Sequence, residues 1–175
     1  MGAVSSPDKE IGVGVRLRVA SARHGVVVVA AFKILFFSYR PHYAVYMIKT
    51  GILNPHVLDL LARVRHTNTL VIADRGFPFW PQIETVDVSL VDGVPTVLQV
   101  LAALRAHAIF GKAWMANEFL RENDQPTQHR FRAALEGVSL KFEPHVEFKK
   151  RVPHAVGLIR TGDTTQYANV ILESA

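Results

Sequence analysis

The sequence contains no cysteine. It therefore has no disulfide framework, no thiolate nucleophile and no zinc site built on thiolates. The lack of cysteine fits a reducing compartment, and we expect the protein to act in the cytoplasm. The eight histidines form no His-x-His or His-x-x-x-His pair, so the chain also lacks a local metal-ligand motif.

Other functional motifs are missing too. The sequence has no GxGxxG, no GxxxxGK[ST] and no GxSxG pattern, so neither a dinucleotide site, a phosphate-binding P-loop nor a nucleophile elbow is marked. It also has no long hydrophobic run. The apolar run that begins at Gly25 is interrupted by Lys33 and ends near Phe37, which is shorter than the ~20 residues of a membrane span.

Acidic residues are scarce in the first part of the chain, where none occurs between Glu10 and Asp59. Residues 1–46 carry six Lys or Arg against two acidic residues, which accounts for +4 of the net charge of +5. Residues 47–175 are therefore nearly neutral. A basic surface for nucleic acid is not supported, and we expect no nucleic-acid partner.

Residues 1–46 differ in kind from the rest, and three interpretations stay open. They are a translated upstream region with Met47 as the natural start, a real arm outside the catalytic domain, or a targeting or membrane-surface segment. A charged start before a short apolar run is typical of a signal peptide, but SYRPHY offers no small-x-small cleavage site. We favour the first interpretation, and a membrane partner is not expected.

Residues 47–175 have an ordinary globular composition within a chain that is 49% hydrophobic and 20% charged. Strands alternate with helices, which predicts an α/β domain with a mostly parallel sheet. Apolar spacing and turn residues predict helices over 55–65, 95–104, 117–137 with a break near 124–126, and 144–151. They predict strands over 69–73, 86–90, 112–116, 138–142, 155–160 and 167–172.

Two residues flank the first predicted strand and could carry chemistry. His66 precedes it, and histidine can give and take a proton near neutral pH. Asp74 follows it, at the end where parallel sheets bind ligands. A strand of this length spans ~17 Å, so the two side chains cannot be neighbours along one straight strand. Either the strand is shorter, or they meet in different subunits, or one of them is structural.

Further candidates lie near the end of the chain. Tyr167 and Asn169 follow a polar loop, and both side chains can donate and accept hydrogen bonds to sugar hydroxyls. His145 begins a short predicted helix. The basic run Lys149–Arg151 is interpreted as a solvated face rather than a nucleic-acid patch. Phe77 and Trp80 could stack on a sugar ring, although such residues more often fill a core or an interface.

Five pieces in this order resemble the RbsD/FucU family, most closely its ribose pyranase branch. They are HT at His66, ADRGFP at Ala73, HVEFKK at His145, RTGD at Arg160 and YAN at Tyr167. The similarity covers Met47 to Ser174. YAN rather than YGN, and HTNT rather than HGD, favour the ribose branch, whereas Arg75, Phe77 and Trp80 make one loop bulkier and put the identity of the sugar in question.

The resemblance implies a fold and an activity. The fold is a three-layer α/β/α domain with a mixed, mostly parallel sheet of about six strands. The activity is interconversion of the β-pyranose and β-furanose forms of D-ribose, without cofactor or metal. The implied assembly is a homo-oligomeric ring, pentameric or decameric, with the sugar site between adjacent subunits. Such a site would explain why His66 and Asp74 are far apart in one chain.

The resemblance also implies residue roles. His66 takes the place of the catalytic proton donor, with its acid–base partner open. The substrate-binding places fall on Asp74, His145, Tyr167, Ala168 and Asn169. Alternatives are a mutarotase for fucose or another sugar, a sugar-binding or transport-accessory protein without turnover, and a membrane-associated protein anchored through residues 16–37.

Overall fold

A computed structural model describes residues 51–175 of the chain. The helices are α1 (Pro55–Arg63), α2 (Val97–Arg105), α3 (Asn117–Glu122), α4 (Gln125–Ala134) and α5 (His145–Arg151), followed by a 3₁₀ turn, η1 (Val152–His154). The strands are β1 (Thr69–Ala73), β2 (Glu84–Asp87), β3 (Phe110–Ala116), β4 (Ser139–Glu143), β5 (Gly157–Arg160) and β6 (Val170–Ser174). The predicted sequence and types of elements are confirmed, with shifts at their ends.

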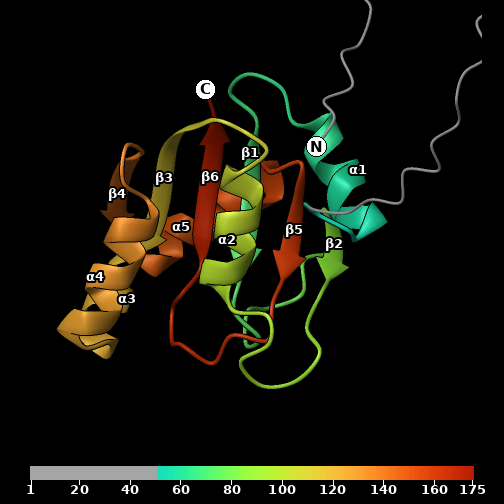
Figure 1. The fold of residues 1–175 in the computed structure, drawn as a ribbon. Helices are drawn as coiled ribbons and strands as arrows, with labels where there is room; N and C mark the ends of the chain where they lie inside the picture. Colours follow the sequence, from blue (N-terminus) through green and yellow to red (C-terminus); the bar gives the residue numbers. More distant parts are fainter. Residues whose placement is uncertain (1–50) are drawn as a thin grey trace, which may run out of the picture. The chain divides into compact units, whose positions relative to one another are not determined.

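The strands form one six-stranded sheet in the order β2-β5-β1-β6-β3-β4 (Figure 1). Strand β6 is antiparallel to its neighbours β1 and β3, while the other three pairings are parallel. The sheet is therefore mixed and mostly parallel, as predicted. Because β6 runs the opposite way, its first residues lie at the edge where β1 to β5 end. This edge is called the carboxyl edge below.

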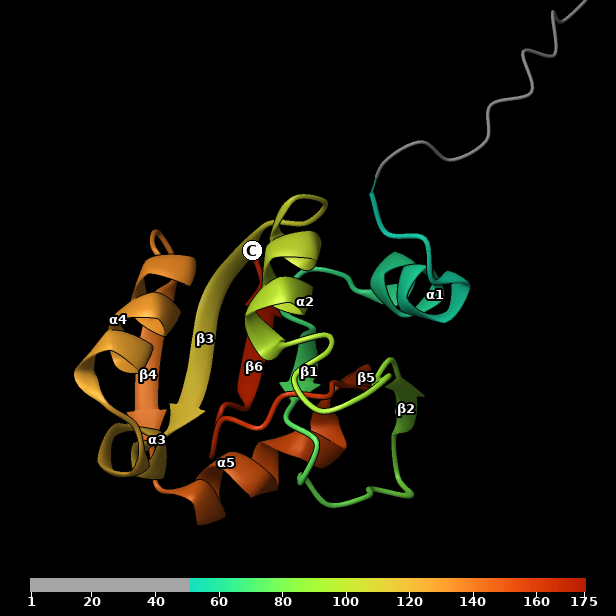
Figure 2. The same cartoon turned by 60° about the horizontal axis from the view of Figure 1, so that its bottom comes forward.

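Successive side chains along the strands point to opposite faces of the sheet and pack into two separate hydrophobic cores. Leu70 and Ile72 of β1 join the larger core, which lies beneath α1 to α4, whereas Val71 and Ala73 join the smaller core beneath α5. Figure 2 shows α5 on the side of the sheet opposite α2 and α4. The residues of β1 are uniformly apolar because both faces of the strand are covered, and the predicted three layers are confirmed.

Side-chain caps fix where three of the helices begin. The Oδ1 atom of Asn54 accepts the backbone N–H groups of His56 and Val57, at 2.9 and 3.2 Å. At α2, Thr96 and Gln99 form a reciprocal capping box. Asp124 caps α4 and separates it from α3, which produces the predicted interruption of the 117–137 helical region.

Strands β2 and β6 differ most from the predicted ranges, and β1 alone begins and ends as predicted. The alternation over 86–90 predicts a strand there, but β2 spans Glu84–Asp87, and the chain then turns so that the Leu90 N–H donates to the Val94 carbonyl at 2.9 Å. The prediction that the last strand begins at Tyr167 is also wrong. Tyr167 has φ +55°, a left-handed conformation that cannot continue a strand, and β6 begins at Val170.

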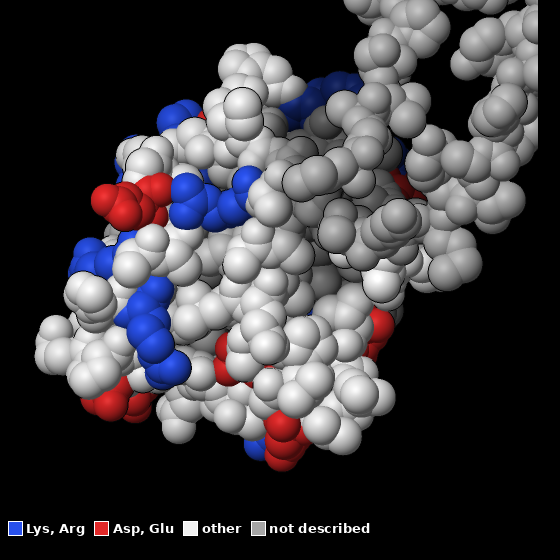
Figure 3. Space-filling model, in the orientation of Figure 1, with Lys and Arg blue, Asp and Glu red and all other residues white. Residues whose placement is uncertain are grey.

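The expectations about residues 1–46, including the membrane-surface reading of residues 16–37, lie outside the described residues. Within 51–175, no helix is both long and apolar enough to cross a membrane. On the described part of the face shown in Figure 3, basic and acidic side chains are interspersed and form no continuous basic area. This distribution agrees with the nearly neutral charge of this part of the chain.

Candidate functional site

A hollow of about 250 Å³ opens at the carboxyl edge of the sheet. Four of the predicted substrate-binding residues line it, since Asp74 follows β1, His145 begins α5, and Tyr167 and Asn169 precede β6. These residues are up to 95 positions apart in the sequence. They come together because β6 pairs antiparallel with β1, so that the start of β6 lies beside the end of β1. Helix α5 begins at the same edge because it follows β4 directly. The remaining lining residues are Gly76, Phe77, Pro78, Lys149 and Gln166.

Asp74 and Asn169 form a reciprocal pair. The Asp74 backbone N–H donates to Asn169 Oδ1 at 2.8 Å, and Asn169 Nδ2 donates to Asp74 Oδ2 at 2.9 Å. The Gly76 backbone N–H donates to the other carboxylate oxygen, Oδ1, at 2.9 Å. Asn169 is only 2% exposed, so its amide has little freedom to reorient. The carboxylate therefore has a fixed orientation at the wall of the hollow.

The pKa of Asp74 is raised above the usual 3.8, first because burial penalises the charged form. The hydrogen bonds from Asn169 and Gly76 act in the opposite direction, and the nearby charge of Asp163 raises the pKa further. Since a raised pKa means that the folded protein binds this proton more readily than the unfolded chain, the contribution of Asp74 to stability falls as the pH rises above 3.8 through the raised value.

The rings of His145 and Tyr167 meet edge to face, with centroids 5.0 Å apart and planes at 85°. Burial is the main cause that lowers the pKa of His145 below 6.5; the charge of Lys149 lowers it too, and that of Glu118 opposes the shift. Burial and the charge of Lys149 therefore both favour the neutral imidazole. Its Nε2 atom is buried and has no hydrogen-bond partner within residues 51–175.

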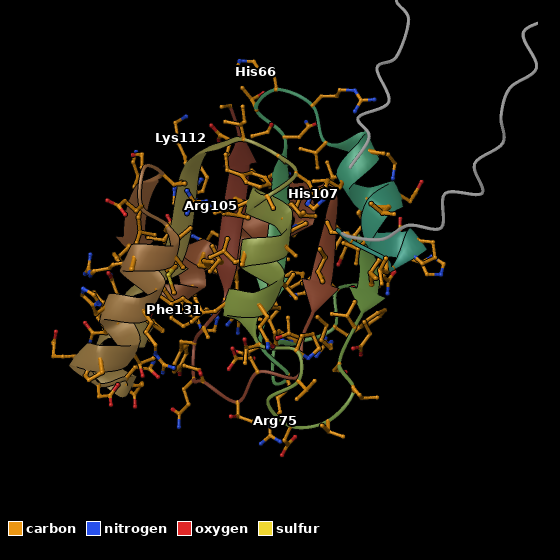
Figure 4. The ribbon with its side chains drawn as sticks, in the orientation of Figure 1. His66, Arg75, Arg105, His107, Lys112 and Phe131 are labelled. Carbon is orange, nitrogen blue, oxygen red and sulfur yellow. The ribbon has the colours of Figure 1, made fainter. Side chains whose placement is uncertain are left out.

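His66 lies at the other edge of the sheet, away from the hollow. Figure 4 shows His66 and Arg75, the neighbour of Asp74, at opposite ends of the sheet. His66 is exposed on a tight turn in which Thr67 has φ +66°. The turn is tied to the end of β6, because Ser174 O accepts the Thr67 N–H at 3.3 Å and Ser174 N–H donates to Asn68 O at 3.0 Å. Within one chain, His66 is therefore far from the predicted substrate-binding residues at the hollow.

Ala168 differs from the other predicted residues. It is fully buried in the larger core and does not line the hollow. Lys149 was predicted to belong to a solvated face, but the structure places it at the hollow. Lys150 and Arg151 form surface ion pairs with Glu147 and Glu143, as expected for a solvated face, but Lys149 lines the hollow. Its position one helical turn after His145 was the available signal.

We expect Asn169→Asp to destabilise the protein by about 1–3 kcal/mol at pH 8. The change replaces the amide that donates to Asp74 Oδ2 with an oxygen, so two carboxylates face each other. The loss should shrink toward pH 5, because a proton shared between the two carboxylates restores a donor. Chemical denaturation at both pH values measures the effect.

The matched control for this variant is Asn117→Asp, which adds the same charge at the exposed first residue of α3. It should change the unfolding free energy by less than about 0.5 kcal/mol at either pH. An equal loss for Asn169→Asp at pH 5 and pH 8 would contradict the fixed amide–carboxylate pairing.

Comparisons with known proteins place these residues in a family. Residues 47–175 match the model of the RbsD / FucU transport protein family. The chain is 40% identical over 128 residues to a D-ribose pyranase of Geobacillus kaustophilus, covering 73% of this chain and 93% of that protein. It is 41% identical over 130 residues to a D-ribose pyranase of Halalkalibacterium halodurans, covering 73% and 97%.

Solved structures of other proteins have a similar fold. Bacillus subtilis RbsD in complex with D-ribose superposes with a TM-score of 0.69 at 34% identity, covering 74% of this chain and 98% of that chain. The fucose mutarotase of Streptococcus pneumoniae in complex with L-fucose gives a TM-score of 0.60 at 20% identity, covering 70% and 92%, and shares the fold. On the family match and the identity to the two pyranases, this chain belongs to the RbsD / FucU transport protein family.

Proposed function

We propose that the protein is a D-ribose pyranase-like isomerase that interconverts the β-pyranose and β-furanose forms of D-ribose. The observation that carries the proposal is the convergence of Asp74, His145, Tyr167 and Asn169 on one hollow. Its volume of about 250 Å³ lies below the roughly 300–1,000 Å³ of pockets for drug-sized ligands and suits a monosaccharide. The relatives named D-ribose pyranase, at about 40% identity, support the same reaction.

The chemistry of the hollow suits a polyhydroxylated, uncharged ligand. The oriented carboxylate of Asp74 accepts hydrogen bonds from sugar hydroxyls. The Nε2 atom of His145, which is buried and has no partner within residues 51–175, would supply either a donor or an acceptor, depending on its tautomer, once it is exposed to the sugar. The Tyr167 hydroxyl can do both. Sugar binding therefore uses several fixed polar groups on a scaffold that also presents apolar ring faces, from Phe77 and Tyr167.

In this proposal the proton donor comes from a second copy of the chain. His66 of one subunit completes the hollow of its neighbour, since His66 and the hollow lie at opposite edges of the sheet within one subunit. A contact between two different edges of identical chains is heterologous and closes into a ring when the rotation allows. A pentameric ring or a decamer of two rings is the assembly proposed for this protein.

Ring opening and closure need only proton transfers. The anomeric hydroxyl loses its proton while the bond between C1 and the ring oxygen breaks, and the ring oxygen takes a proton from His66. In the open aldehyde, the C4 hydroxyl then adds to C1, loses its proton, and the carbonyl oxygen is protonated, giving the furanose. No atom is oxidised or reduced, so the proposal includes no cofactor or metal. The compartment proposed is the cytoplasm.

Exchange NMR on ribose tests the function. Added protein should accelerate pyranose–furanose exchange by about 10²–10⁴-fold at saturating enzyme, the usual contribution of positioned acid–base catalysis. The same measurement on fucose and other monosaccharides separates a ribose enzyme from another mutarotase. If sugars raise the melting temperature but no sugar exchanges faster, the protein is a binding module and the enzyme proposal is wrong.

A further inference from the structure

The short helix α3 contacts the walls of the hollow without lining it. It follows β3 directly, so it lies at the carboxyl edge, where β3 ends. Glu118 of the helix and Asn123, the residue that follows it, each hydrogen-bond to the backbone of a residue that lines the hollow. The two walls are those of His145 and Tyr167, whose rings contact each other.

Asn123 holds the wall that carries Tyr167. Its Nδ2 atom donates to the Phe119 carbonyl at 2.9 Å and to the Gln166 carbonyl at 2.8 Å. The next residue, Tyr167, has φ +55°, which an L-residue adopts only when its surroundings impose it. The backbone of Asn123 is itself fixed, because buried Gln128 donates to its carbonyl at 2.9 Å. This bond network therefore helps to impose the conformation that turns Tyr167 toward the hollow.

Glu118 holds the other wall. Its Oε2 atom accepts the backbone N–H of His145 at 2.9 Å, at the first residue of α5. Pro144 precedes this residue and provides no side-chain cap, so the carboxylate of Glu118 takes the part of a capping residue from a distant element. The Glu118 side chain is 21% exposed, so water competes only partly for it.

We propose that Glu118 and Asn123 are positioning residues for the sugar site, which set the edge-to-face geometry of His145 and Tyr167 from the same short helix. Neither side chain lines the hollow, so neither touches the sugar. They position the two rings through backbone groups of His145 and Gln166, and the charge of Glu118 separately raises the pKa of His145. The inference rests on the proposed function for its sugar effect, but the ring geometry can be measured without any sugar.

The test compares Glu118→Ala and Asn123→Ala with two controls. Glu118→Gln keeps an acceptor oxygen for the His145 N–H, and Glu122→Ala removes an exposed acidic side chain from the same helix. The first readout is the imidazole resonance of His145 in sugar-free protein, which the neighbouring Tyr167 ring displaces. The second is ribose exchange, separated into KM and kcat. Thermal melting confirms that each variant is folded.

Both alanine variants should shift the His145 resonance and raise KM by about 3–10-fold, the equivalent of one net hydrogen bond, with kcat nearly unchanged. Glu122→Ala should resemble the wild type. Glu118→Gln should keep the wild-type KM and, at a pH where His145 is neutral, the wild-type resonance, because the lost charge changes the pKa of His145 but not the hydrogen bond to its N–H. An unmoved His145 resonance in folded Glu118→Ala and Asn123→Ala would overturn the inference. A shifted resonance in a protein whose wild type exchanges no sugar would uphold the positioning role and refute the proposed function instead.

Discussion

Replacing His66 with alanine is expected to remove the acceleration of ribose exchange, a loss of about 10²–10⁴-fold, while ribose still binds. The reason is that His66 supplies a proton in the proposed reaction, whereas the groups proposed to bind the sugar hydroxyls line the hollow at the opposite edge of the sheet. Exchange NMR gives the rate, and calorimetry gives the affinity. The control His129→Ala removes an exposed histidine from α4 and should change neither quantity.

Mixing two inactive variants gives a sharper version of this test. His66→Ala subunits keep a complete hollow, and Asp74→Asn subunits keep His66. If each site takes one edge from each of two subunits, random co-assembly of equal amounts restores about one site in four. Activity in the mixture, when each variant alone is inactive, would support the shared site. A silent mixture that is shown to co-assemble would contradict it, as would full activity of His66→Ala alone.

Replacing Phe148 with alanine is expected to destabilise the protein by about 3–5 kcal/mol. Phe148 is fully buried in the smaller core, where it meets Phe77 edge to face at 6.1 Å and lies 6.0 Å from the His145 ring. Among the described residues, Phe148 is the one member of α5 that belongs to the smaller core. Because a domain usually has about 5–15 kcal/mol of stability in total, the melting temperature should fall by more than about 10 °C.

The control for this variant is Val146→Ala, a 65% exposed position on the same helix, which should change stability by less than about 0.5 kcal/mol. Phe148→Leu should recover part of the loss, since it refills some of the cavity. A fall of only two or three degrees for Phe148→Ala would mean that α5 contributes little to the smaller core.

Local signals in the sequence were enough for most of the fold. The Asn54-Pro55 pair predicted the start of α1, and the Asp124-Gln125-Pro126 stretch predicted the break between α3 and α4. Both outcomes depend on groups within a few residues, which is why sequence reasoning reaches them. The same reasoning missed the capping box of Thr96 and Gln99, although its Thr-x-x-Gln spacing is visible in the sequence.

Features that depend on distant contacts could not be predicted. The conformation of Tyr167 depends on its surroundings, among them Asn123, 44 positions earlier, which holds the preceding carbonyl, and an extended start of the last strand was the reasonable local prediction. Lys149 was assigned to a solvated run because its neighbours are charged, whereas its own direction depends on how α5 packs on the sheet. The residue types of the site were recognisable, but the pairing of Asp74 with Asn169 required the fold.

The antiparallel direction of β6 has a consequence for how the protein tolerates change. The strand begins beside Tyr167 and Asn169 and ends at Ser174, which anchors the turn of His66. In a closed ring these two ends would belong to two different sugar pockets. A one-residue slip in the pairing of this five-residue strand would therefore disturb both pockets at once, so sequence drift in β6 should be more damaging than drift in any strand that borders a single pocket.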